Sequence, residues 1–135
     1  MRFELKCWLP CIIAGLLTMV VFRVVLLIGI VPSSSMEPLI PAGSVILADR
    51  TAYWNREPVT GEVIVFGYKD TILIKRIAAT AGETVIHSGK VLLVPDGCFY
   101  VLGDNQNSSI DSSVWNEPFI SAADVIGRLI FFRHL

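Results

Sequence analysis

Three consecutive serines, Ser33 to Ser35, stand directly after a long apolar run and are followed at once by the residues MEP. A serine hydroxyl becomes a nucleophile only when a neighbouring base can take its proton. Histidine is the usual base, and the sequence has two, His87 and His134. One stands beside a Ser-Gly turn and the other is the penultimate residue, so we interpret both as turn or surface residues. A catalytic triad built on histidine is therefore not expected.

A lysine can deprotonate serine instead if burial keeps it neutral, because desolvation lowers its pKa from about 10.4 by several units. In the segment TILIKRIAA, the two-residue period of a strand places Lys75 on one face with Leu73 and Ile77. Lys69 and Lys90 occur at turn-like positions instead. On this pattern alone, Lys75 is either a buried base or an edge-strand lysine that discourages aggregation.

A second polar cluster, LGDNQNSSIDSS over residues 102–113, follows an apolar strand-like run. By itself it is compatible with a solvated loop that contains Asx turns. Together with the three serines and Lys75, this segment is more informative than a polar loop alone.

The N-terminal segment from Cys7 to Val31 is apolar and is interrupted only by Arg23. A membrane-spanning helix needs roughly 20 apolar residues. We predict a transmembrane helix from about Leu5 to Phe22, with Arg23 reaching the far interface. Arg2 and Lys6 precede the span, so the positive-inside rule places the N-terminus in the cytoplasm and the rest outside. A cleavable signal peptide, cut near residues 31–35, is the alternative interpretation.

The remainder of the chain has the pattern of short strands. A β-branched run covers residues 24–31, and seven further runs are separated by Gly, Pro, Asp and Asn. These runs cover residues 44–50, 62–68, 71–79, 83–87, 90–94, 98–103 and 125–132. The predicted fold is mostly β, an antiparallel β-sandwich or partly open barrel preceded by one transmembrane helix. The predicted domains are a cytoplasmic tip with its anchor over residues 1–23, and an extracytoplasmic β-rich domain over residues 24–135.

Composition narrows the function further. The 135 residues are 53% hydrophobic and carry a formal net charge of -1, which gives no basic surface for nucleic acid. Cys7, Cys11 and Cys98 form neither a CxxC pair nor a cluster with histidine. We therefore expect no disulfide framework, no metal site and no cofactor.

Three segments in this order resemble the type I signal peptidases, which are membrane-bound serine proteases with a Ser/Lys dyad. The segments are PSSSMEP, IKRIAATAGE and VLGDNQNSSIDSSVW, and the resemblance extends from the apolar N-terminus to about Trp115. It implies an enzyme that removes signal peptides from exported pre-proteins by cutting after small residues in an Ala-X-Ala pattern.

The resemblance implies a role for each candidate residue. Ser35 would be the nucleophile, Lys75 its general base, and Ser33 would stabilise the oxyanion through its hydroxyl. Ser109 would orient the lysine, and Asp104 and Asp111 would hold the site together. The family usually has an arginine after the second aspartate and its serine, whereas this chain has Ser113.

Substrate recognition is also implied by the resemblance. The end of the signal peptide would add as a strand beside the segment before Ser35 and the segment around Lys75. The side chains expected to line its shallow pockets are Val31, Pro32, Met36, Ile40, Leu73 and Ile74.

The resemblance implies a protein of the cytoplasmic (plasma) membrane. Its implied partners are the lipid bilayer and the signal peptides of exported pre-proteins, and the secretion translocon stays open as a third partner. Two other functions stay open. One is a conjugation-type maturation peptidase with a single dedicated substrate, and the other is a non-catalytic assembly factor that resembles a signal peptidase.

Overall fold

The computed structural model describes residues 2–134, with side chains described from residue 8 onward. One helix, α1 (Arg2–Val24), is followed by a β-rich part. Its strands are β1 (Leu26–Ile30), β2 (Val45–Asp49), β3 (Val63–Tyr68), β4 (Thr71–Thr80), β5 (Thr84–His87), β6 (Lys90–Leu93), β7 (Cys98–Leu102), β8 (Phe119–Ser121) and β9 (Val125–Arg133). A short 3₁₀ helix, η1 (Ala122–Asp124), joins the last two strands.

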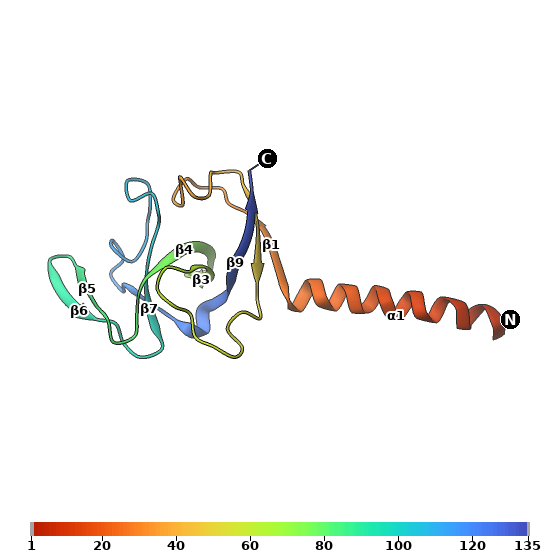
Figure 1. The fold of residues 1–135 in the computed structure, drawn as a ribbon. Coiled ribbons are helices and arrows are strands. Elements are labelled where there is room, and N and C mark those ends of the chain that lie inside the picture. Colours follow the sequence, from red (N-terminus) through yellow and green to blue (C-terminus); the bar gives the residue numbers. More distant parts are fainter. Residues whose placement is uncertain (1, 135) are drawn as a thin grey trace.

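Seven strands form one antiparallel sheet in the order β1-β2-β9-β3-β4-β7-β8. The sheet is open, because its edge strands β1 and β8 do not pair with each other. The remaining strands, β5 and β6, form a separate hairpin. The prediction of a mostly antiparallel β fold is confirmed. Where the sequence predicted a sandwich or a partly open barrel, the described strands form one open seven-stranded sheet with a separate hairpin, and no closed barrel (Figure 1).

Tight turns fix the register of both hairpins. Lys69 and Asp70 connect β3 to β4, and both have positive φ angles of 43° and 62°. Ser88 and Gly89 connect β5 to β6 in the same way, with φ angles of 51° and 78°. Two-residue turns of this handedness match the twist of the flanking strands. The first turn therefore sets Lys75 opposite Ile64 in β3.

The apolar core lies on both faces of the sheet. On one face, Val31, Met36 and Ile40 from the segment after β1 pack against Ile46, Val65 and Ile74. On the other face, Ile64, Phe66 and Ile77 pack with Val101 and Trp115. Burial of a side chain of this size contributes roughly 1.5–3 kcal/mol. The first cluster anchors the segment that carries the serines, and the second includes Trp115, which follows the polar loop after β7.

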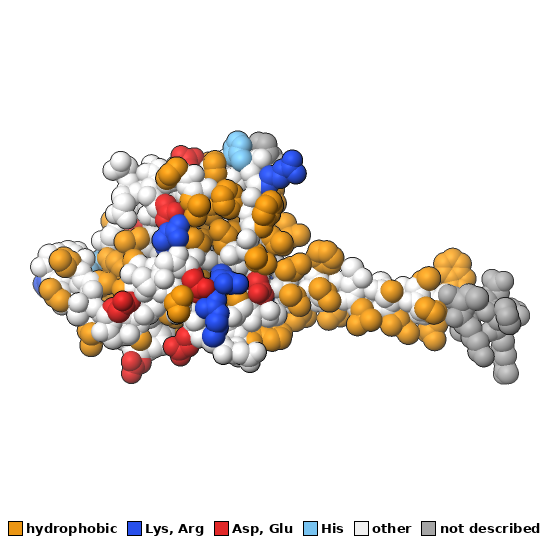
Figure 2. Space-filling model, in the orientation of Figure 1, with side chains coloured by type: hydrophobic (Ala, Val, Ile, Leu, Met, Phe, Trp, Pro, Cys, Tyr) orange, Lys and Arg blue, Asp and Glu red, His pale blue; other side chains and the backbone are white. Residues whose placement is uncertain are grey.

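Helix α1 points away from the β part, and apolar side chains cover its described surface (Figures 1 and 2). Its large apolar residues from Trp8 to Val24 are mostly about half exposed or more. Across the described residues, no helix combines the length and the hydropathy that crossing a membrane requires. The predicted helix is therefore confirmed, whereas its prediction as a transmembrane span is not.

Candidate functional site

The segment that carries the three serines is held at its base by two backbone hydrogen bonds. Val31 N–H donates to the carbonyl of Ser44 at 2.9 Å, and Gly43 N–H donates to the carbonyl of Val31 at 2.7 Å. Ser35 lies in the turn between these points and is only 4% exposed. Its hydroxyl oxygen lies 3.2 Å from that of Ser33. Two hydroxyls are thus placed together at one end of β1.

Lys75 occupies the middle of β4 and is 3% exposed. Burial lowers the pKa of its amine, and the negative charge of Asp111 opposes that shift. The net direction is downward, which favours the neutral amine that a general base requires. The alternative of an edge-strand lysine that discourages aggregation is wrong, because that role needs an exposed side chain and Lys75 is buried.

Asp111 is a buried carboxylate surrounded by hydrogen-bond donors. Its Oδ2 accepts from the N–H of Gly103 at 2.8 Å and from the hydroxyl of Ser109. Its Oδ1 accepts from the hydroxyl of Ser113 at 2.7 Å and from the N–H of Ser113 at 3.1 Å. Burial alone would raise the pKa of Asp111, but these hydrogen bonds lower it on balance. The carboxylate therefore stays charged beside Lys75.

The start of the loop after β7 links this carboxylate to the serine segment. Asn105 N–H donates to the carbonyl of Ser35 at 2.9 Å, and its side-chain amide donates to the carbonyl of Ser34 at 3.1 Å. Gly103 packs so tightly here that an added Cβ would lie 2.5 Å from the Ser35 carbonyl oxygen and 2.6 Å from Ser109 Cβ. Ser35, Ser109 and Asp111 are therefore gathered around one glycine.

A bidentate ion pair fixes the same loop to β4. Arg76 donates from Nε and Nη2 to the two carboxylate oxygens of Asp104, at 2.8 and 2.7 Å. Arg76 follows Lys75 in β4 and pairs with Leu102 of β7, so the ion pair fixes the start of the loop to that strand. At the other end of the loop, Trp115 stacks on Tyr68 with ring centroids 4.0 Å apart. The loop is thus attached to the sheet at both ends.

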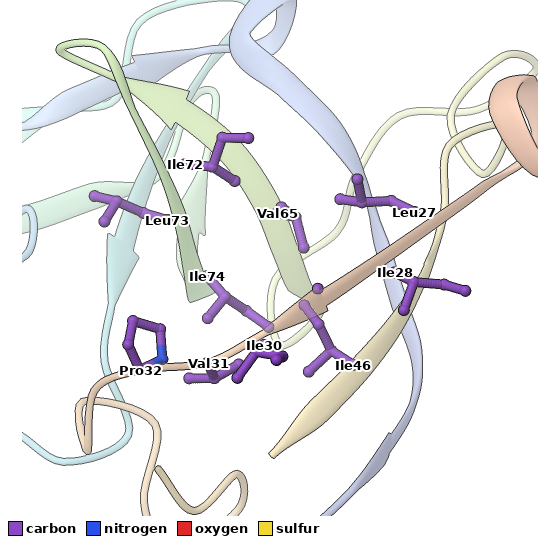
Figure 3. Close-up of a pocket in the computed structure, with 11 residues that line it drawn as sticks. Leu27, Ile28, Ile30, Val31, Pro32, Ile46, Val65, Ile72, Leu73 and Ile74 are labelled. Carbon is purple, nitrogen blue, oxygen red and sulfur yellow. The ribbon is translucent and has the colours of Figure 1, made fainter. Parts of the chain in front are cut away.

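An apolar groove of about 240 Å³ runs along β1 beside the first half of β4 (Figure 3). It is lined by Leu27, Ile28, Gly29, Ile30, Val31, Pro32, Ile46, Val65, Ile72, Leu73 and Ile74. Four of the six residues expected to contact substrate are among them. Met36 and Ile40 are not, because both are completely buried in the core beneath the serine segment.

Several contributors to the site were not predicted from the sequence. Gly103 and Asn105 lie in the polar segment over residues 102–113, where residue type alone does not show that Gly103 packs against Ser35 or that Asn105 donates to its carbonyl. The ion pair of Arg76 with Asp104 was also not predicted, because the two residues lie in separate segments of the sequence. The groove residues Leu27 to Ile30 of β1 could not be predicted, because an apolar strand has the same sequence pattern whether it lines a groove or a core. Their position depends on how the sheet curves, which no local pattern specifies.

The arrangement contains the elements of acyl transfer. It has a buried hydroxyl at Ser35, a second hydroxyl beside it at Ser33, and a buried lysine amine with lowered pKa at Lys75. The groove next to them can take an extended apolar peptide. The described residues include no group of His, Cys, Asp or Glu side chains suited to hold a metal ion.

Comparison with known proteins identifies the same relationship over most of the chain. The family described as "Signal peptidase, peptidase S26" matches residues 5–94 and 87–133. The chain is also similar to "Probable thylakoidal processing peptidase 2, chloroplastic" of Arabidopsis thaliana, with 30% identity over 134 residues. That match covers 75% of this chain and 36% of the Arabidopsis protein.

Two bacterial proteins show a similar relationship. "Probable signal peptidase I-1" of Synechocystis sp. is 31% identical over 134 residues, which cover 75% of this chain and 67% of that protein. "Signal peptidase I" of Aquifex aeolicus is 45% identical over 58 residues, which cover 41% of this chain and 23% of that protein. The chain spans 36% and 40% of the length of two Arabidopsis relatives that it matches, which is well under half.

Proposed function

The chain belongs to the signal peptidase family, peptidase S26, and we propose that it is a serine endopeptidase that removes N-terminal signal peptides from exported pre-proteins. It cuts after small residues in an Ala-X-Ala pattern. One observation carries this proposal: Ser35 and Lys75 are both buried, Gly103 of the loop that holds Asp111 packs against the Ser35 carbonyl, and the charge of Asp111 acts on Lys75.

The proposed reaction begins with neutral Lys75. Its amine takes the proton of the Ser35 hydroxyl while the Ser35 oxygen attacks the scissile carbonyl carbon. The hydroxyl of Ser33 and the backbone N–H of Ser35 donate to the resulting oxyanion. Protonated Lys75 then gives its proton to the leaving amine, and the signal peptide remains as an ester on Ser35. Water activated by the same lysine hydrolyses that ester and restores the free serine.

The substrate is proposed to bind as an added strand between β1 and β4. β1 pairs only with β2, and the described pairing of β4 with β7 begins at Arg76. Backbone groups of Thr71–Ile74 on that side are therefore available to an extended peptide. Main-chain hydrogen bonds would supply affinity, and the groove would select side chains. Val31, Pro32, Leu73 and Ile74 stay the proposed contacts, while Met36 and Ile40 support the serine segment from below.

We place the protein at the cytoplasmic membrane, anchored through α1 with the N-terminus in the cytoplasm and the β part outside. The support is physical: apolar side chains of α1 face outward over its described length, where water would be an unfavourable surrounding. Arg2 and Lys6 at the start of the chain favour a cytoplasmic N-terminus.

The decisive experiment is cleavage of a pre-protein with an Ala-X-Ala end by the purified, detergent-solubilised chain. Ser35→Ala and Lys75→Ala are the test variants. Ser34→Ala and Lys90→Ala are matched controls, because neither side chain belongs to the proposed network. We expect cleavage after the second alanine by the unaltered chain and both controls, and none by the two test variants.

Two outcomes would redirect the proposal. Binding of the pre-protein without cleavage by the unaltered chain would favour a non-catalytic assembly factor. Cleavage of one pre-protein from a panel, with rejection of other Ala-X-Ala proteins, would favour a maturation peptidase with a dedicated substrate. Cleavage retained in Ser35→Ala would contradict the assignment of the nucleophile.

A further inference from the structure

An open hollow lies where helix α1 runs into the β part of the chain (Figure 1). Its volume is about 460 Å³. Two arginines, a tryptophan and three apolar residues surround this space, away from the serines and the lysine of the proposed peptidase site. The lining residues are Arg23, Val24, Arg50, Trp54, Val125 and Ile126.

Arg50 is fixed to the chain at the end of α1 through two of its groups. Its backbone N–H donates to the carbonyl of Val25 at 2.8 Å, and its Nη1 donates to the carbonyl of Arg23 at 3.2 Å. The last carbonyls of a helix carry partial negative charge, so a cation there is favourable. A guanidinium has five N–H donors in a planar fork. The described contacts of the Arg50 side chain use one of them, so the other donors are available to a ligand in the hollow.

The two arginines of the hollow carry positive charge that the described carboxylates do not neutralise. Within the part of the chain whose side chains the structure describes, no ion pair involves Arg23 or Arg50. Both residues are exposed. A neighbouring hollow beside Arg56 differs, because Arg56 is paired with Glu62 and Glu57 also lines that space. An anion would therefore meet a net positive charge at Arg23 and Arg50.

The surroundings of the two arginines favour a lipid over a soluble anion. The large apolar side chains of α1 stay exposed up to Phe22 and Val24, at 54% and 46%. Trp54 is 67% exposed beside them. Tryptophan and arginine side chains at the end of an apolar helix favour the level of the lipid headgroups. The apolar surface of the helix thus ends where the two guanidinium groups lie.

We propose that Arg23 and Arg50 bind the phosphate of an anionic phospholipid, with Trp54 packed against the glycerol and the first carbons of its acyl chains. This inference rests on the part of the proposed function that places α1 in the membrane. Guanidinium groups bind phosphate oxygens through paired, charge-assisted hydrogen bonds. Because β1 begins directly after α1 and lines the peptide groove, a lipid bound here holds the start of that groove at the membrane surface.

The test titrates dihexanoyl phosphatidylglycerol into the full chain in neutral detergent by isothermal titration calorimetry, with empty micelles as the blank. Dihexanoyl phosphatidylcholine and inorganic phosphate are titrated in parallel. The unaltered chain should bind the phosphatidylglycerol saturably, about fivefold or more tightly than either of the other two. Arg23→Gln and Arg50→Gln should each raise the Kd for phosphatidylglycerol by about fivefold or more.

Arg133→Gln is the matched control, because it removes an exposed arginine at the other end of the β2–β9 ladder. It should leave the Kd unchanged. Thermal melting of each variant checks folding. Arg50→Gln loses a hydrogen bond to the helix end, whereas the described contacts include none from the Arg23 side chain, so Arg23→Gln tests the site if Arg50→Gln does not fold. All three variants should cleave an Ala-X-Ala pre-protein in detergent at the rate of the unaltered chain.

The results separate the lipid site from the peptidase activity. Cleavage without saturable binding of phosphatidylglycerol overturns the lipid site and leaves the peptidase intact. Equal affinity for inorganic phosphate or for phosphatidylcholine also overturns it, as does an unchanged Kd in folded Arg23→Gln. Saturable binding that the arginine variants lose, in a chain that cleaves no pre-protein, overturns the peptidase activity and supports the lipid site.

Discussion

At the scale of single residues, Ser113 occupies the position where the resemblance leads one to expect arginine. Its hydroxyl and N–H donate hydrogen bonds to one oxygen of Asp111, so neutral donors bind this carboxylate where an arginine guanidinium was expected. Arg76, the cation beside Lys75 in β4, is paired with Asp104 instead. Lys75 therefore experiences the charge of Asp111 without an intervening cation among the described contacts of that carboxylate.

Asp111→Asn should move the pH dependence of cleavage toward lower pH. A general base acts in its neutral form, so kcat/KM rises as pH increases through the pKa of Lys75. The negative charge of Asp111 raises that pKa against the effect of burial. Removing the charge lowers the pKa of Lys75, and the rising limb of a kcat/KM profile should shift accordingly.

Asp104→Asn serves as the control for this prediction. Asp104 binds Arg76 and is not among the groups that shift the pKa of Lys75. Asp104→Asn should lower activity or stability without shifting the pH at which kcat/KM rises. A shift of the Asp111→Asn profile to higher pH would show that Asp111 does not act on Lys75 through its charge.

Gly103→Ala should remove most activity and lower stability together. The new methyl group would overlap the carbonyl oxygen of Ser35 and the side chain of Ser109, and backbone cannot yield as a flexible side chain does. Cleavage rate and melting temperature are the measurements. Gly67→Ala is the control, since a Cβ there meets nothing within 4 Å. A fully active Gly103→Ala variant would contradict the packing of the serine segment against this loop.

At the scale of secondary-structure elements, most strands could be predicted from short apolar runs between turn residues. Each of the seven predicted runs agrees with one observed strand to within one residue at either end, and β1 lies within the predicted run over residues 24–31. β8 was missed because three residues, Phe119 to Ser121, are too few to show alternation. Strand order could not be predicted, since β9 inserts between β2 and β3 through pairing far apart in the sequence.

One ion cluster joins elements that a local pattern cannot connect. Glu62 binds Arg56 at 2.6 Å, Arg128 of β9 at 3.4 Å and the hydroxyl of Tyr53 at 3.1 Å. Burial alone would raise the pKa of Glu62, but hydrogen bonds from Arg56, Val59 N–H and Tyr53 lower it to about 2. This cluster attaches the loop between β2 and β3 to the sheet.

Glu62→Gln should therefore destabilise the protein in a pH-dependent way. A carboxylate with a depressed folded-state pKa stabilises fully above its unfolded pKa near 4.5 and loses this effect as pH falls toward about 2. The melting temperature of Glu62→Gln should lie a few degrees below that of the unaltered chain above pH 5.

The difference should close as pH approaches 2. Glu57→Gln is the control because Glu57 is exposed and contacts this cluster through its backbone carbonyl, which accepts from Arg56, and not through its carboxylate. A difference for Glu62→Gln that stays constant from pH 7 to pH 2 would contradict a role for its charge.

At the scale of the whole molecule, the site depends on sheet curvature. The sequence motifs place Ser35, Lys75 and Asp111 in three separate segments, and their residue types could be assigned from the family resemblance. The groove between β1 and β4 could not, because these strands are four places apart in the sheet and meet only through its curvature.

The apolar helix is the other feature that belongs to the whole molecule. Replacing Leu16 and Leu17 together by lysine should release the protein from membranes, because charged side chains are costly in hydrocarbon. Both leucines are exposed on α1, at 58% and 61%. Partition between the membrane pellet and the supernatant after alkaline carbonate extraction measures the effect.

Val91→Lys provides the matched control for this change. It places a lysine at an exposed apolar residue of the β5–β6 hairpin, where the native valine is 71% exposed. This variant should remain in the pellet with the unaltered chain. A double lysine variant of α1 that also remains in the pellet would contradict anchoring through this helix.

The central claim is that Lys75 acts as a base toward Ser35, and Lys75→Arg tests it most directly. Arginine keeps the positive charge and a long side chain, but its very high pKa keeps it protonated, so it cannot accept the serine proton. We predict that Lys75→Arg lowers kcat/KM for an Ala-X-Ala pre-protein by about 10²–10⁴-fold at every pH, while folded Lys90→Arg is unaffected. Cleavage by Lys75→Arg at a rate near that of the unaltered chain would show that the buried lysine only supports the structure.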